Sequence, residues 1–150
     1  MIAVVQRVSS ASVRAHDIDN YFQSIQNGLL ILLGVEQNDS KIGAQWMAKK
    51  CANLRIFADS CKKMNESVID KNGEILAISQ FTLAANCRKG NRPSFVNAAD
   101  PDLAEELYDE FVHLLRQKHG IPTKAGVFQA HMEVNLTNDG PVTIILRYPE

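Results

Sequence analysis

Apolar residues gather in short runs along this chain, and most of the runs are too short for helices. Residues 2–8 (IAVVQRV) are rich in β-branched side chains, which favour strands. A second strand is expected at about 11–15. The run GLLILLGV at 28–35, bounded by Gly28 and Gly34, is typical of a strand that is buried on both faces.

Two stretches have the apolar spacing of an amphipathic helix. The first follows Asp39 and Ser40, which are good N-cap candidates. The second follows Asp100-Pro101, where the aspartate caps the helix and the proline takes its first turn. The expected apolar positions of the two helices are Ile42, Trp46, Met47, Cys51 and Leu54, and then Leu103, Leu107, Phe111, Leu114 and Leu115.

Strand character returns in the middle of the chain. It is expected at 55–59 (RIFAD) and, after the turn signal Asn72-Gly73, at 74–83 (EILAISQFTL). Residues 86–102 lack any regular pattern and carry most of the local positive charge. We interpret this stretch as a surface loop.

Two further strands are expected between about Val127 and Arg147, separated at residues 138–141 (NDGP). Strands therefore outnumber helices and do not alternate with them regularly. This order disfavours a doubly wound α/β fold. The sequence predicts one α+β domain over residues 1–150, with a curved, barrel-like mixed sheet and two main helices.

The charge and cysteine content narrow the possible functions. The chain has 16 Lys+Arg and 17 Asp+Glu, so it lacks the positive excess of proteins that wrap duplex nucleic acid. Any RNA contact should be local, at an end or a loop. The cysteines form no CxxC pair and the histidines show no metal-ligand spacing, so we expect neither a metal nor another cofactor.

The start of the chain, MIAVVQRVSS, lacks the long apolar region of a signal peptide. No apolar run approaches the ~18 residues of a membrane span. We therefore expect a cytoplasmic protein that does not associate with membranes.

The pentapeptide Ser79-Gln80-Phe81-Thr82-Leu83 places hydrogen-bonding groups where a buried strand meets a loop. One interpretation is that these groups only satisfy neighbouring strands. The alternative is a substrate-facing rim, with the backbone N–H of Phe81 directed at a developing negative oxygen.

Three other features admit two interpretations each. Residues 138–143 (NDGPVT) are a plain hairpin turn on generic grounds, and the sequence alone does not decide the state of the Gly140-Pro141 bond. Arg88, Lys89 and Arg92 form a solvated loop or hold RNA phosphates. Arg7, which interrupts an apolar strand, faces outward or braces nearby carbonyl oxygens.

Taken together these motifs resemble those of the D-aminoacyl-tRNA deacylases, in the same order and spacing from Met1 to about Leu146. SQFTL and NDGPVT at this separation, with the N-terminal QRVSSASV, are highly specific. The matching segments are VVQRVSSASV, GLLILLGV, LRIF at 54–57, KMN at 63–65, SQFTL at 79–83, RKGNRPSF at 88–95 and NDGPVT at 138–143.

The resemblance implies a homodimeric hydrolase that cleaves the ester of D-aminoacyl-tRNA and rejects the L-isomer. It also implies a cis Gly140-Pro141 bond, steadied by Arg7, that reaches into the partner's active site and excludes L-side chains. Ser79, Gln80, Phe81 and Thr82 would then line the pocket for the scissile ester. Gly126, Phe128 and Met132 fall in a stretch that resembles the family's adenosine-side wall.

A filter that reads only the α-carbon should admit glycine, so glycyl-tRNA is an expected second substrate. Either the RNA 2′-hydroxyl or Thr82 would assist the attack, and the second is weaker because no recognisable base accompanies it. Two alternative functions stay open: a non-catalytic protein that binds RNA ends, and a small Ser/Thr esterase.

The chain departs from the family pattern in three places. Residues 16–27 lack the glycine-bearing hairpin, Gln129 replaces a small residue after Phe128, and Asn135 stands where serine is common.

Overall fold

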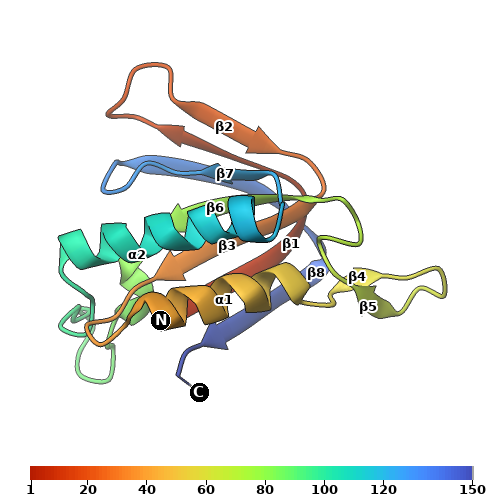
Figure 1. Ribbon diagram of the computed structural model, residues 1–150. Coiled ribbons are helices and arrows are strands. Elements are labelled where there is room, and N and C mark those ends of the chain that lie inside the picture. Colours follow the sequence, from red (N-terminus) through yellow and green to blue (C-terminus); the bar gives the residue numbers. More distant parts are fainter. Residues whose placement is uncertain (150) are drawn as a thin grey trace.

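The long first strand organises the sheet. The computed structural model describes residues 1–149, and in it β1 (Ile2–Ala15) is one uninterrupted strand (Figure 1). The expected division into two strands is wrong, because β1 stays paired with β8 on both sides of Ser9 and only the register shifts there. One edge of β1 pairs first with β3 (Gly28–Gly34) and then with β2 (Phe22–Ile25).

The other edge of β1 pairs with β8 (Met132–Arg147) along almost its whole length. β6 (Glu74–Ser79) lies parallel to β3, and the short β7 (Thr123–Ala125), which the sequence pattern did not reveal, lies parallel to β6. The sheet order is β2-β1-β3-β6-β7, with β8 added on β1. The prediction of an α+β fold with a curved mixed sheet is confirmed.

Two helices cover one face of this sheet and lie side by side, as Figure 1 shows. They are α1 (Lys41–Asn53) and α2 (Pro101–His113), and α2 continues into a wider turn, η2 (Leu114–Lys118). Both predicted helices are confirmed, although neither Ser40 nor Asp100 makes a capping hydrogen bond with its side chain.

The buried face of α1 differs from the prediction. Ile42 is 66% exposed, so it is not a core position. The face against the core instead carries mostly small side chains, which let the helix approach the sheet closely. Its buried residues are Gly43, Ala44, Met47, Ala48, Cys51 and Ala52. None of the helices within residues 1–149 is long and apolar enough to cross a membrane.

β6 is fixed by apolar side chains on both of its faces. Ile75 and Ala77 belong to the core between sheet and helices, while Leu76 and Ile78 belong to a second cluster on the concave side. This alternation has the two-residue period of a strand. It sets the register of β6 and therefore the position of Ser79 at its end.

The middle segments form less strand than expected. RIFAD supplies only β4 (Phe57–Ala58), which pairs with β5 (Met64–Glu66) in a small hairpin that projects from the body (Figure 1). β6 ends at Ser79, and Phe81–Ala84 form a 3-10 turn, η1. The expected strand over 80–83 is wrong because β3 ends at Gly34 and offers no partner beyond it.

The C-terminal segment is also one strand, so the expected hairpin at 138–141 is wrong. Val8 pairs with Asn138 and Gln6 pairs with Thr143. Only Arg7 of β1 therefore faces the four residues Asp139–Val142, which we call the 139–142 bulge. Within it the Gly140–Pro141 bond is cis, as the resemblance implies, and Gly140 has φ +125°.

Candidate active site

A cavity of about 640 Å³ opens where β6 ends. Its lining is mostly apolar, with polar groups confined to the strand end and to one loop. Such a composition is typical of small-molecule sites, which combine an apolar lining with a few polar groups. The residues that line it are Val35, Ile78, Ser79, Gln80, Phe81, Ala98, Ala99, Pro101, Ala104, Phe128, Gln129, Ala130, Met132 and Val134.

The rim of the cavity is formed by Ser79, Gln80 and Phe81, three of the residues predicted from the SQFTL motif. The N–H of Gln80 donates the last ladder bond, 2.7 Å to the carbonyl oxygen of Leu33. The chain then turns into η1. Because the first N–H groups of a helical turn have no partner within it, the N–H groups of Phe81 and Thr82 are left for a ligand, and neither donates to another group within residues 1–149.

Thr82 does not line the cavity itself but is tied to the rim. Its Oγ1 accepts a hydrogen bond from the side-chain amide of Gln80. Among the described residues this is the one side-chain hydrogen bond to Thr82, and an amide nitrogen cannot take a proton. Gln80 therefore orients the Thr82 hydroxyl without activating it as a nucleophile.

Another part of the cavity wall is built by Phe128 and Met132. Gly126 lies behind this wall, and a Cβ there would come within 2.6 Å of the Met132 Sδ atom. The glycine thus allows the thioether to pack close to the end of β6. Tyr108 supports Phe128, with the two rings 6.4 Å apart, and donates its hydroxyl to the carbonyl oxygen of Ala77 at 2.9 Å.

Gln129, on the same wall, has a left-handed backbone with φ +60°. This conformation is uncommon for a residue with a side chain, because the Cβ crowds the backbone there. The departure noted in the sequence therefore falls on the cavity lining.

Arg7 anchors the 139–142 bulge, which confirms that this arginine braces carbonyl oxygens. Its Nε lies 3.1 Å from the carbonyl oxygen of Asp139 and 3.2 Å from the Asp139 carboxylate, and its NH1 group donates to the carbonyl oxygen of Ile56 at 2.6 Å. The Asn138 side chain donates to the carbonyl oxygen of Val142 at 3.0 Å and closes the bulge.

Gly140 is required in this bulge for two reasons. Its φ of +125° disfavours any L-residue, and a Cβ would lie 2.8 Å from the NH2 group of Arg7. Both Gly140 and Pro141 are exposed. The structure thus gathers Arg7, Gly140 and Pro141 into one surface feature.

The bulge and the cavity lie at opposite ends of the sheet. Asn138 pairs with Val8, which pairs with Gly28 opposite Glu74, the first residue of β6. The cavity begins at Ser79, the last residue of that strand. At ~3.3 Å per residue the two ends are roughly 16 Å apart. One chain therefore does not bring Gly140 and Pro141 to its own cavity.

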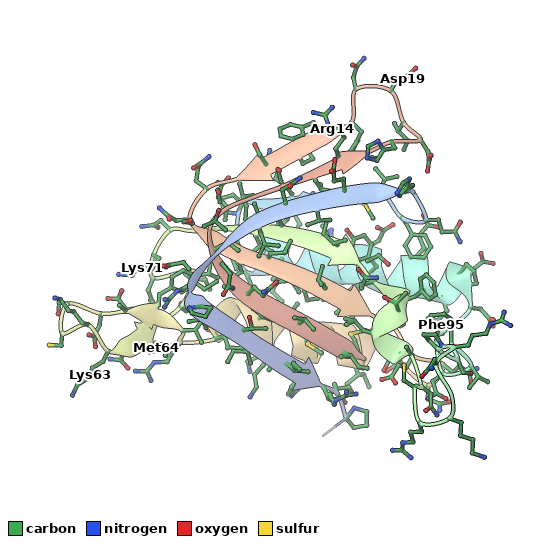
Figure 2. The ribbon with its side chains drawn as sticks, turned by 180° about the vertical axis from the view of Figure 1, so that it is seen from behind. Arg14, Asp19, Lys63, Met64, Lys71 and Phe95 are labelled. Atoms are coloured by element: carbon green, nitrogen blue, oxygen red, sulfur yellow. The ribbon has the colours of Figure 1, made fainter. Side chains whose placement is uncertain are left out.

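The third predicted group, Arg88, Lys89 and Arg92, lies on the exposed loop that follows η1. Figure 2 shows this loop at the end of the molecule marked by Phe95, away from the bend of β8 near Lys71. None of the three cations forms an ion pair within residues 1–149. They lie beyond the cavity rim rather than in its lining.

Several cavity residues gave no signal in the sequence. Val35, Ala98, Ala99 and Ala104 line the site with small apolar surfaces, and no motif distinguishes such residues from ordinary core positions. The contact of Phe95 with Phe81 was also missed. Over residues 1–149 there is no cluster of three or more His, Cys, Asp or Glu that could hold a metal ion.

The fold and site define an α+β protein whose apolar cavity presents free backbone N–H groups at a strand end. A family model described as "D-Tyr-tRNA(Tyr) deacylase" matches residues 4–147. The chain therefore belongs to the D-Tyr-tRNA(Tyr) deacylase family.

Individual relatives agree with this assignment. The chain is 56% identical to a D-aminoacyl-tRNA deacylase of Geobacter sulfurreducens, over 97% of this chain and 94% of that protein. It is 51% identical to a D-aminoacyl-tRNA deacylase of Petrotoga mobilis, over 97% of this chain and 96% of that protein.

Two solved structures have the same fold. One, named "c-Myc DNA Unwinding Element Binding Protein", is 41% identical with a TM-score of 0.90 and covers 100% of both chains. The other, described as a probable eukaryotic D-amino acid tRNA deacylase, has a TM-score of 0.85 at 15% identity over 97% of both chains, so it supports the fold alone.

Proposed function

We propose that this protein hydrolyses the ester that joins a D-amino acid to the 3′ end of tRNA, and that it leaves L-aminoacyl-tRNA intact. The observation that carries the proposal is the rim of the cavity, where Phe81 and Thr82 present free N–H groups beside an apolar pocket. Its volume of about 640 Å³ suits a small ligand such as a terminal adenosine with its amino acid. We also propose that the protein acts in the cytoplasm, where it would meet its aminoacyl-tRNA substrate.

In the proposed reaction a water molecule attacks the ester carbonyl carbon. A carbon–oxygen bond to water forms, the bond to the ribose oxygen breaks, and the water's proton passes to that ribose oxygen. The N–H of Phe81 stabilises the negative charge that develops on the carbonyl oxygen. One such donor contributes about 10²–10³ in rate, and an aminoacyl ester needs less help than a peptide bond.

The neighbouring ribose 2′-hydroxyl positions the water in this scheme. Thr82 is the rival candidate, as a nucleophile. The Thr82 hydroxyl accepts a hydrogen bond from the side-chain amide of Gln80, and an amide cannot act as a base. This favours the ribose 2′-hydroxyl over Thr82. Ser79 would complete the polar rim around the ester.

The rest of the terminal nucleotide would lie on another part of the cavity wall. Phe128 and Met132 offer apolar surface to the adenosine, and Gly126 keeps Met132 in place. Arg88, Lys89 and Arg92 would hold phosphates of the preceding nucleotides. This local contact agrees with a net charge of only −1.

We also propose that the protein acts as a homodimer in which Gly140 and Pro141 of one subunit enter the cavity of the other. The roughly 16 Å between bulge and cavity in one chain supports this arrangement. β8 also exposes apolar side chains, with Ile145 62% and Leu136 37% exposed. An Ile145→Asp substitution should give monomers in light scattering and lose deacylation. Ile42→Asp is the control, because Ile42 is also exposed (66%) but lies on α1, and it should leave the dimer and the activity intact.

Handedness would be read at the α-carbon by backbone atoms of Gly140 and Pro141. A snug side-chain pocket cannot do this for many amino acids, because one methylene changes binding by only ~1–3 kcal/mol. A backbone wedge leaves the side chain free to project away. Glycine has no side chain to exclude, so glycyl-tRNA should be a second substrate.

The deciding experiment follows ester loss from D-Tyr-tRNA, L-Tyr-tRNA and Gly-tRNA with purified protein. We expect turnover of the first and third and none of the second. Inertness toward both D-Tyr-tRNA and Gly-tRNA would refute the proposal.

A second candidate is nucleic-acid binding without catalysis, favoured because the 41% identical solved structure is named a DNA unwinding element binding protein. A protein whose Phe81 amide is replaced by an ester, and which binds the RNA end normally but loses turnover, would argue against it. A third candidate, a Ser/Thr esterase, predicts that an acyl-trapping reagent labels Ser79 or Thr82.

A further inference from the structure

Two aromatic side chains beside the cavity remain exposed. Phe81 is 54% and Phe95 is 38% exposed, and their ring centroids are 5.1 Å apart in an edge-to-face arrangement. We call them the aromatic pair. Phe81 lines the cavity and Phe95 lies next to it on the outside. The pair therefore extends the apolar surface of the cavity outward.

The backbone holds Phe95 firmly on both sides. Ser94 exchanges two backbone hydrogen bonds with Asn86, of 2.8 and 3.0 Å, and the N–H of Ala98 donates to the carbonyl oxygen of Phe95 at 3.0 Å. Ala98 also forms a bridge with Glu36. The ring is exposed although its chain segment is tied to the fold, so it is a preformed surface rather than a loose loop residue.

A positively charged loop lies next to the aromatic pair. Residues 86–96 contain Arg88, Lys89 and Arg92 and no acidic residue. Figure 2 shows Phe95 where this loop leaves the body, with long side chains extending from the loop beyond it. The order outward from the cavity is thus aromatic pair and then cations.

We propose that the aromatic pair is a stacking platform for the base of the nucleotide that precedes the terminal adenosine, with the loop cations on its phosphates. Proteins bind single strands by this combination, since every base has a face that can stack on an aromatic ring. The inference rests on the proposed function, because it assumes that the terminal adenosine occupies the cavity.

The test compares two substrates, 2′(3′)-O-D-tyrosyl adenosine and the same ester on the dinucleotide CpA. Stacking of one base contributes about 5- to 150-fold. We expect the dinucleotide to have a kcat/KM higher than the nucleoside by a factor in this range. Phe95→Ala should lower the ratio of the two values severalfold, and Phe95→Leu should do nearly the same.

Two variants complete the design. Phe95→Trp keeps an aromatic face and should retain the ratio. Val96→Ala removes a neighbouring side chain that is 66% exposed but lies outside the pair, so it should also retain the ratio. Thermal unfolding of each variant shows whether it is folded. A ratio unchanged in folded Phe95→Ala protein would overturn the platform.

Binding of uncharged CpA and of adenosine, measured by calorimetry, gives a second ratio that needs no turnover. It separates the two proposals. If the protein hydrolyses neither ester, the proposed function fails, and the effect of Phe95→Ala on CpA binding still decides on the platform. If both esters are hydrolysed equally well by the unaltered protein, the platform fails and the function stands.

Discussion

The rim at Ser79–Thr82 and the 139–142 bulge both hold backbone groups in defined positions, but they do so by different means. The rim emerges from β6, whose residues Ile75 and Ile78 are 0% and 2% exposed. The bulge lies on exposed β8, opposite a single residue of β1. Apolar packing from many sides positions the first, and two polar side chains, Arg7 and Asn138, position the second.

This difference predicts different responses to mutation. A backbone group held by many core contacts is insensitive to any one side chain and responds only when the group itself is removed. A bulge held by Arg7 should respond strongly to one substitution. The variants below address this comparison, beginning with the largest expected effect.

Replacement of the Phe81 amide by an ester, using phenyllactic acid at position 81, removes its N–H and keeps its side chain. If this N–H stabilises the oxyanion, kcat for D-Tyr-tRNA should fall by about 10²–10³. Single-turnover kinetics provides the measurement. The same replacement at Phe95 is the control and should leave kcat nearly unchanged. Equal kcat values for the two backbone-substituted proteins would show that the Phe81 N–H does not stabilise the oxyanion.

Gly140→Ala should disrupt the bulge, because the Cβ would lie 2.8 Å from Arg7 NH2 and 2.9 Å from Val142 Cγ2. With a φ of +125° the strain should be about 1–3 kcal/mol. If restoring the bulge to its active position costs this energy in the variant, kcat/KM should be roughly 5- to 150-fold lower. Gly120→Ala is the matched control, since Gly120 also has a positive φ but nothing lies within 4 Å of a Cβ there. Equal losses of activity in both would point to general strain instead of the bulge.

Arg7→Ala removes the donors to the carbonyl oxygens of Asp139 and Ile56. The free energy of unfolding should fall by about 1–3 kcal/mol, measured by urea titration. Discrimination between D- and L-Tyr-tRNA should also weaken, by about tenfold if ~1.4 kcal/mol of the loss falls on the bulge. Arg14→Ala, on the same strand with its guanidinium over Phe22, should leave discrimination intact. A change in stability without a change in discrimination would show that Arg7 does not help the protein to distinguish D- from L-Tyr-tRNA.

The smallest effect is expected for Gly126→Ala on the adenosine wall. The new Cβ would contact Met132 Sδ at 2.6 Å, but methionine is flexible and can move aside. We expect KM to rise by about fivefold, equivalent to ~1 kcal/mol, with kcat unchanged. Steady-state kinetics against D-Tyr-tRNA would show this, and a fall in kcat with constant KM would contradict it.

Local patterns predicted the elements whose determinants are local. The stripe Leu107, Phe111 and Leu115 and the Asp100-Pro101 start identified α2 correctly. The apolar run at 28–35 identified a doubly buried strand. These signals work because burial and helix starts depend on residues close together in the chain.

The errors arose where distant residues decide. Asn138–Pro141 resemble a hairpin turn, but Arg7 fills the bulge and pairing with β1 resumes at Thr143. The strand at 74–83 stops early because β3 ends. At the site, the sequence located Ser79–Phe81 on the cavity, but not the small residues Ala98 and Ala104 that shape it. The roles of these residues in catalysis stay predictions.

The register of β8 on either side of the 139–142 bulge has a consequence for how such a protein can diversify. Val8 pairs with Asn138 before it and Gln6 with Thr143 after it, so both halves of the strand are aligned independently of what lies between. An insertion or deletion there alters the length of the projection and shifts no other pair in the sheet. The length of the projection can therefore change over evolutionary time while the scaffold stays constant.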